Sequence, residues 1–245
     1  MFDTLRSETL KTLSTKGTIV LLVGGVAVVA LATASTMLSM PPANLEGPIH
    51  EQVAYFIGSV VLVVFALIVG MRSFTDEFRH GTVLTTVLVS SSRTELLVAK
   101  AIVTMGVTLT MSVLGLATLT VVALSLSGAK GGALDLAGSD WSAFAGLVSA
   151  MLVWTVVGVG LGALIRNQVA AVVGALVWVL VAENFAGGFI GEAARLMPGQ
   201  LSNAMADVSS TTSLLGALPA ALLLIGYALL ISFAAGVTLD RRDVI

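Results

Sequence analysis

Six stretches of the chain contain no charged residue, and apolar residues dominate each of them. These stretches cover residues 17–45, 52–71, 101–129, 141–165, 167–182 and 208–239. A helix needs about 20 apolar residues to cross the hydrocarbon core of a bilayer. Five stretches meet that length, and the fifth in chain order meets it only by continuing through Glu183 and Asn184 to Ile190. The pattern therefore predicts transmembrane helices at 18–40, 52–72, 97–126, 141–165, 167–190 and 214–239.

The first residues of the chain have a different, amphipathic pattern. At 100° per residue, one helix face carries Phe2, Leu5, Thr9, Leu10 and Leu13, and the other carries Asp3, Ser7, Glu8 and Lys11. This pattern predicts a helix over residues 2–16 that lies at the membrane surface and leads into the first span. Two alternatives are a frayed tail and a secretory signal cleaved after Ala32-Thr33-Ala34. The predicted organisation is an interfacial helix at 1–17 and a six-span domain at 18–245.

Composition supports an all-α integral membrane protein with six transmembrane helices. The 245 residues are 57% hydrophobic and only 11% charged, too few polar residues to cover a soluble core. The chain has no cysteine and no G-x-x-x-x-G-K-[ST] loop, and its two histidines are far apart. We therefore predict no catalytic, cofactor-binding or metal-binding residue in this chain, and no nucleic-acid partner.

Lys and Arg residues are distributed unevenly between the predicted loops. With the N-terminus inside, all but two of the 12 face the cytoplasm; the exceptions are Lys130 and Arg195. Because cytoplasmic loops are rich in Lys and Arg, both termini are predicted to be cytoplasmic. Tyr55 and Trp141 then fall at the outer interface as aromatic anchors. The abundance of Ala, Val and Gly, with Arg preferred over Lys, indicates a bacterial plasma membrane.

The loop between the second and third spans holds much of the cytoplasmic charge. Gly81-Thr82 can end one helix and cap the next, and Ser90-Ser91-Ser92 can cap the third span. Between them, an apolar stripe predicts a short helix that docks on a partner or dips into lipid; its members are Val83, Leu84, Val87 and Leu88. The alternatives are topology signals at the arginines and an exposed ion pair of Glu77 with a nearby Arg.

Several short motifs resemble the type-2 (ABC-2) family of ABC transporter permeases. One is Glu77, Arg79, Gly81-Thr82, a Leu-rich turn, Ser92-Arg93 and Lys100; the others are the Gly-rich stretch from Gly158 to Arg166, and Leu196-Met-Pro198. The resemblance implies that the loop forms a coupling helix that seats in a groove of an ATPase subunit. The implied contact residues are Glu77, Arg79, Gly81, Thr82, Val83, Leu84, Val87, Leu88 and Arg93. ATP and Mg²⁺ would be bound by the partner subunit.

The predicted function is that of the membrane-spanning permease subunit of an ATP-driven exporter. By resemblance, two such chains, identical or related, and two ATPase subunits would move an amphipathic cargo such as a lipid, peptide or drug. The alternative is a non-transporting assembly or regulatory protein, or a secondary carrier. The spans contain few ionisable groups near the midplane, which such a carrier usually needs.

Two further features concern the second half of the chain. Glu183, about 25 Å along a helix from Arg166, is either a residue of the outer boundary or, with Asn184, part of a cavity or outer gate. Residues 184–213 are predicted to form short helices that dip into the outer leaflet. The spacing of Gly158 and Gly162 indicates close helix packing.

Overall fold

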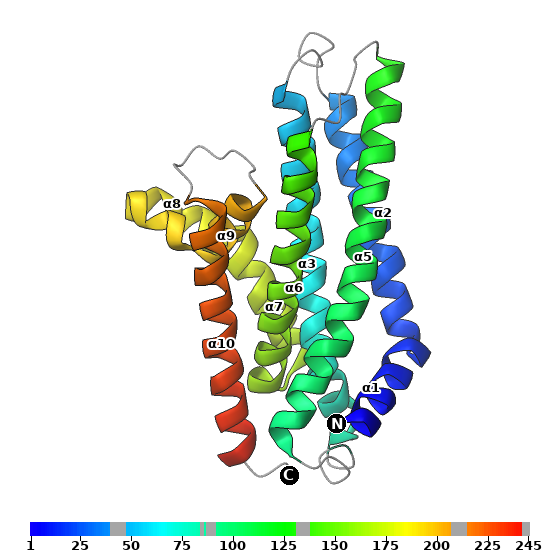
Figure 1. The fold of residues 1–245 in the computed structure, drawn as a ribbon, viewed down its shortest axis with the longest axis vertical. Coiled ribbons are helices and arrows are strands. Elements are labelled where there is room, and N and C mark those ends of the chain that lie inside the picture. The colour runs from blue at the N-terminus through cyan, green and yellow to red at the C-terminus, as the bar shows by residue number, and fades with distance from the viewer. Residues whose placement is uncertain (40–47, 84–85, 87–91, 131–137, 207–214, 242–245) are drawn as a thin grey trace.

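The computed structural model describes residues 1–39, 48–83, 86, 92–130, 138–206 and 215–241, and the described part contains helices and no β-strand (Figure 1). The α-helices are α1 (Phe2–Ser14), α2 (Lys16–Ser39), α3 (Pro48–His80), α5 (Arg93–Ala129), α6 (Gly138–Ile165), α7 (Gln168–Val177), α8 (Glu183–Ile190), α9 (Pro198–Met205) and α10 (Ala217–Arg241). A π-helical turn, η2 (Trp178–Ala182), follows α7, and a 3-10 helix, η3 (Gly191–Leu196), follows α8. The all-α prediction is confirmed.

Five helical segments of the described chain are long and apolar enough to cross a membrane. They are Lys16–Ser39, Arg93–Ala129, Trp141–Ile165, Gln168–Leu196 and Ala217–Leu239. Each contains or overlaps one of the predicted spans. The predicted second span, 52–72, lies within α3, which is not one of these five segments, so the count of six remains a prediction.

The centre of the bundle is formed by α3 and α6, which approach each other at glycines. A Cβ atom on Gly158 would collide with the carbonyl oxygen of Leu67, and one on Gly162 would collide with that of Met71. Small residues allow helix backbones to come this close, so the close-packing interpretation of the glycine spacing is confirmed. Around this contact, Leu62 and Met151 are completely buried. These contacts hold the middle of α3 tightly against α6.

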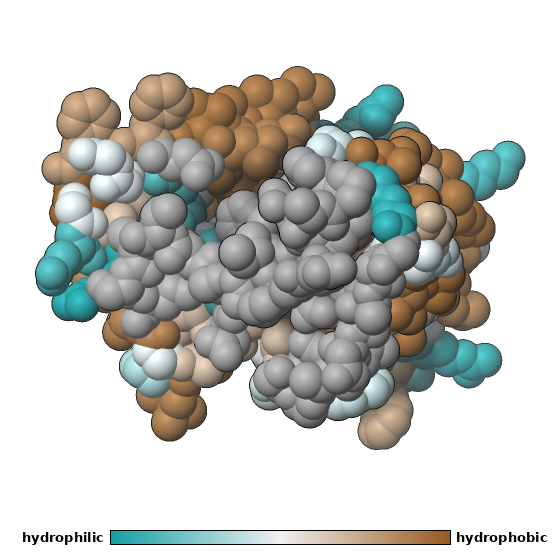
Figure 2. Space-filling model, turned by 90° about the horizontal axis from the view of Figure 1, so that it is seen from above, coloured by the Kyte–Doolittle hydropathy of each residue, from teal (hydrophilic) through white to brown (hydrophobic). Residues whose placement is uncertain are grey.

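The outer faces of the bundle are apolar, in contrast to those of a soluble protein. On α2 and α10, large exposed side chains include Val20, Leu31, Leu218 and Phe233. Figure 2, a view from the end of the bundle away from α1, shows hydrophobic residues around much of the described rim. Exposed apolar surface of this extent fits a lipid environment.

The fifth predicted span changes direction before its predicted end. α7 and η2 together rise roughly 20 Å, which is short of a full crossing. Figure 1 shows α8 turned across the bundle axis, so the part that follows the bundle ends near Ala182 rather than at the predicted Ile190. The π-helical turn supplies the physical reason, because its extra residue changes the helix register immediately before Glu183.

Short helices follow this turn, as predicted for the connection 184–213. They are α8, η3 and α9, while residues 207–214 lie outside the described part. The position of these helices in the bilayer stays a prediction. At the other end of the chain, α1 covers most of the predicted helix 2–16. The exposed Phe2, Leu10 and Leu13 of α1 are available to lipid, and its membrane-surface position also stays a prediction.

Candidate functional site

The end of α3 is built by a glycine. Gly81 adopts a φ of 67°, in the left-handed region that favours glycine. Its N–H donates to the carbonyl oxygen of Phe78 at 3.4 Å, and the N–H of Thr82 donates to that of Glu77 at 3.0 Å. These two bonds form a Schellman motif, which satisfies carbonyl groups at the helix end. The predicted helix end at Gly81-Thr82 is therefore confirmed.

The segment after Gly81 returns to the bundle at a serine cap. The hydroxyl of Ser92 accepts a hydrogen bond from the N–H of Glu95 at 3.0 Å and so caps α5, as predicted. Between the two ends, Val83 and Thr86 are helical. Val83 is buried within the chain, so it is not exposed for the predicted contact with a partner. Leu84, Val87 and Leu88 lie outside the described residues.

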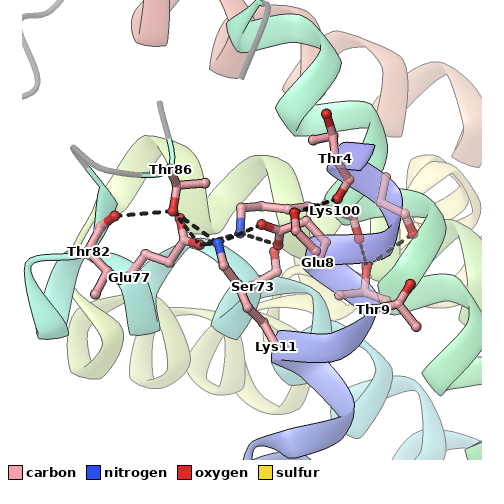
Figure 3. A network of polar contacts seen from close by, with 12 residues as sticks. Thr4, Glu8, Thr9, Lys11, Ser73, Glu77, Thr82, Thr86 and Lys100 are labelled. Carbon is pink, nitrogen blue, oxygen red and sulfur yellow. Dashed lines mark hydrogen bonds and ion pairs between the residues drawn. The ribbon is translucent and has the colours of Figure 1, made fainter. Parts of the chain in front are cut away.

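Four charged side chains from three helices meet where this segment leaves α3 (Figure 3). The Lys100 Nζ of α5 lies 2.7 Å from Glu8 Oε2 of α1 and 2.9 Å from Glu77 Oε1 of α3. The Lys11 Nζ of α1 lies 2.9 Å from Glu8 Oε1 and 3.1 Å from Glu77 Oε1. We call Glu8, Lys11, Glu77 and Lys100 the charge network. It joins α1, α3 and α5 and alternates negative and positive groups.

The charge network extends into the loop through Thr86. The Lys11 Nζ donates to the Thr86 hydroxyl at 3.0 Å, and that hydroxyl donates to Glu77 Oε1 at 3.2 Å. Among the described residues of the predicted coupling segment, Thr86 thus connects directly to the ends of α1 and α3.

Three of the four charged groups are removed from solvent. Lys100 is 2% exposed, Glu8 4% and Glu77 8%. The Lys100 Nζ also lies 5.2 Å from the centroid of the Phe74 ring, a cation–π geometry. Buried charges are tolerated when they are paired and hydrogen-bonded, and these groups supply that pairing to one another, except at Glu77 Oε2, which is buried without a hydrogen-bond partner among the described residues.

The charge network changes the proton affinity of its members on α1. Burial alone would raise the pKa of Glu8, but the ammonium groups of Lys100 and Lys11 outweigh it and hold that pKa below its usual value. Burial alone would lower the pKa of Lys11, but its hydrogen bond to Glu8 and the charge of Glu77 raise it above the usual value. Both residues therefore keep their charges more firmly than in an unfolded chain.

The structure corrects the alternative given for Glu77. Its ion-pair partners are Lys11 and Lys100 rather than a nearby Arg, and it is buried rather than exposed on a solvated face. Arg79 points elsewhere, donating to the side-chain oxygen of Gln168 at 3.1 Å. Arg93 begins α5. The predicted contact residues therefore surround one loop, but they do not form a single charged group.

Sequence reasoning missed that Lys100 and α1 meet Glu77 at this site. The sequence analysis predicts α1 to lie at the membrane surface and names Lys100 as a cytoplasmic cation and as part of the family motif, but it pairs neither with Glu77. One signal was available, since Lys100 lies inside the predicted third span and a Lys within a span usually has a partner. Glu8 was one of two acids in this leader, with Asp3, and was therefore a candidate for that partner.

A second cluster surrounds Glu183, away from the charge network. Its Oε1 accepts a hydrogen bond from Trp178 Nε1 at 2.9 Å, and its Oε2 accepts one from the Gly199 N–H at 2.8 Å. Glu183 is 5% exposed and lines a cavity, and its assignment to the outer boundary or to a gate stays a prediction. Gly199 is in the first turn of α9, where a carboxylate is favoured. Asn184 lies next to it in α8.

Comparison with known families identifies the class to which this helical membrane protein belongs. Residues 4–182 match a family model described as ABC-2 family transporter protein. Because the match covers well over half of the chain, the chain belongs to the ABC-2 transporter family. The resemblance drawn from the loop motifs is thereby confirmed. Membership makes this chain a non-catalytic component of a membrane transporter and implies a partnership with an ABC ATPase in general.

The family match has a boundary that matters for the second cluster. It ends at residue 182, immediately before Glu183, so α8, η3, α9 and α10 lie outside the matched region. No curated protein matches the sequence.

Proposed function

We propose that this chain is the permease subunit of an ATP-driven exporter of amphipathic cargo in a bacterial plasma membrane. Two copies, or this chain and a related one, would pair with two ATPase subunits that bind ATP and Mg²⁺. Both termini and the 81–92 segment would face the cytoplasm, with the segment seated in a groove of the ATPase. Apart from the family, three features support this proposal: the excess of Lys and Arg in the predicted cytoplasmic loops, the apolar outer faces of the bundle, and the geometry of the charge network.

The observation that carries the proposal is the position of the charge network beneath the loop. Thr86 of the loop contacts both Lys11 and Glu77, and the charge network ties α1, α3 and α5 together at that point. Movement of a loop held in this way would pull on three helices together rather than deform the loop alone. Such a junction suits a subunit whose energy comes from ATP closure of a separate protein.

A pull-down of the ATPase subunit, combined with transport into vesicles, tests the proposal. Leu84→Asp would place an unpaired carboxylate in the proposed groove, which costs several kcal/mol, so ATPase capture should be lost. Leu84→Met, which keeps an apolar side chain of similar size at the same position, is the matched control and should retain capture. Normal capture and transport by Leu84→Asp would remove the coupling assignment.

Orientation has its own test, because the chain has no cysteine and any introduced one is unique. Single cysteines at Ser73 and Ser91 should react with a membrane-impermeant maleimide only from the cytoplasmic side. Cysteines at Asn44 and Ser139 should react only from outside. Labelling of Ser91→Cys from the outside in intact cells would contradict the proposed topology.

A further inference from the structure

The surroundings of Glu183 contain a small cavity of about 180 Å³ with a mixed apolar and polar lining, which we call the polar cavity because it carries this carboxylate. α3 contributes Val60 and Val63 to its lining, and η2, α8 and α9 contribute Val179, Glu183, Gly199 and Asn203, among others. Glu183 is the charged side chain among the lining residues. Figure 1 shows α8 and α9, which contribute lining residues, beside the bundle, away from α1 and short of the far end of α5.

The charge of Glu183 is not balanced within the described chain. Its two oxygens accept N–H groups, as an ionised carboxylate does, but among the described residues no Lys, Arg or His makes an ion pair with it. A buried carboxylate held only by neutral donors remains costly, and a cation beside it would reduce that cost. This arrangement differs from that of Glu8 and Glu77, which have lysines.

A second buried oxygen in the same cavity supports a cationic ligand. The Gln200 Oε1 is buried and accepts no hydrogen bond from any residue that the structure describes. Gln200 and Glu183 line the same cavity, so the residues around it include an acceptor oxygen that no described donor uses as well as a carboxylate. The N–H donors of Trp178 and Gly199 are already used by Glu183. A ligand that brings N–H donors and positive charge therefore fits this lining better than an anion does.

A larger apolar cavity of about 650 Å³ adjoins the polar one. Val179 lines both cavities. Trp154 lines the apolar cavity, and its Nε1 donates to the hydroxyl of Ser202, which lines the polar cavity, at 2.7 Å. Trp178 also lines the apolar cavity, and its Nε1 donates to Glu183 of the polar cavity. The two indole N–H groups are thereby satisfied, which leaves their rings as apolar walls. Tyr227 likewise donates its hydroxyl hydrogen to the Leu196 carbonyl oxygen, at 3.3 Å.

We propose that these adjoining cavities form one binding site for an amphipathic primary ammonium compound. Its ammonium group binds Glu183 and Gln200 Oε1, and its apolar body lies against Trp154 and Trp178. A primary ammonium has three N–H donors and a full charge, which match the acceptors of the small cavity. The inference rests on the proposed transport function insofar as it names the cargo class, but binding itself needs no ATPase.

Binding of dodecylamine, which is an ammonium at neutral pH, to the full chain in nanodiscs tests the site. Dodecanol and dodecanoate have the same chain length with a neutral and an anionic head, and empty nanodiscs correct for lipid partitioning. Dodecylamine should bind saturably and more tightly than either. Glu183→Gln should weaken its binding at least about 30-fold, since the variant removes one partner of a buried charge pair. Glu192→Gln, which removes an exposed carboxylate nearby on η3, should leave binding unchanged.

A second variant keeps the test decisive if Glu183→Gln disturbs α9. Gln200→Lys keeps Glu183 with both of its hydrogen bonds but supplies an internal ammonium, so it should also abolish dodecylamine binding. Unchanged binding in Gln200→Lys or Glu183→Gln, or equally tight binding of dodecanol, would overturn the inference. ATPase capture is measured on the same samples. If the unaltered chain fails to capture the ATPase subunit, the proposed function is contradicted, while the dodecylamine result still decides the binding site.

Discussion

Replacing Lys100 by Met should release α1 from the bundle. Lys100 is 2% exposed, and its ammonium contacts Glu8 at 2.7 Å and Glu77 at 2.9 Å. Met has a similar length, so the change removes the charge and leaves little empty space. Removing one partner of a buried ion pair typically costs about 3–5 kcal/mol, because the other charge stays buried. Since Lys11 still neutralises part of the two carboxylates, we expect a value near the lower limit, about 3 kcal/mol.

Two measurements follow this change in the purified chain. The midpoint of thermal unfolding in nanodiscs should fall, and tryptic cleavage after Arg6 of α1 should become faster as the helix detaches. Lys16→Met is the matched control, because Lys16 is exposed and makes no ion pair among the described residues. It should leave both measurements close to those of the unaltered chain.

A double variant tests whether the lost charge pairing is the cause. Adding Glu8→Met to Lys100→Met replaces a buried pair by apolar groups, which is often neutral or stabilising. The double variant should therefore be more stable than Lys100→Met alone. The charge network does not hold α1 in this way if Lys100→Met behaves like Lys16→Met. The same conclusion follows if the double variant loses more stability than the sum of the losses in the two single variants.

Three further predictions concern single features. The pKa of Glu8 in the folded chain lies below its usual value of 4.5, so its ion pairs contribute fully to folding stability above that pH, and this contribution is lost as the pH falls through the lowered pKa. Acid should therefore lower the unfolding temperature less in Glu8→Gln than in the unaltered chain. Gly81→Ala should lower stability by about 1 kcal/mol because of its positive φ, and Gly81→Asn by less, as thermal unfolding would measure. Gly162→Leu should prevent accumulation of folded chain, judged by size-exclusion chromatography, whereas Gly106→Leu, at an open position, should not.

Local sequence signals predicted the ends of the helices that surround the loop. Gly81 ends α3 and Ser92 caps α5, because each signal acts within a few residues and needs no knowledge of the rest of the fold. The helical face of α1 was also readable, since Glu8 and Lys11 fall on one side at 100° per residue. Such periodicity identifies a face but not the helix that it contacts.

The partners of these faces could not be read from the sequence. Lys100 and Glu8 are 92 positions apart. The position of Lys100 inside the predicted third span indicates that it needs a partner, but the local pattern does not identify that partner. The cost of Glu77→Ala illustrates the difference. For an exposed ion pair it would cost only about 0–1 kcal/mol, whereas a member of a buried charge network costs more. The π-helical turn before Glu183 likewise has no sequence signal, and it decides where that carboxylate points.

α3 connects the charge network to the proposed ammonium site. Glu77 lies near its end, and Val60 and Val63 line the polar cavity roughly 20 Å along the same helix. Between them, α3 packs against the glycines of α6 with no room for a side chain, so local bending there would meet the α6 backbone. A pull on Glu77 would therefore be passed along α3 as movement of the whole helix rather than absorbed by a kink. Because Glu183 is held by α9 and η2 rather than by α3, such movement would change the distance between the cavity walls. One helix thus suffices to link the loop that is proposed to meet the ATPase with the site that is proposed to hold the cargo.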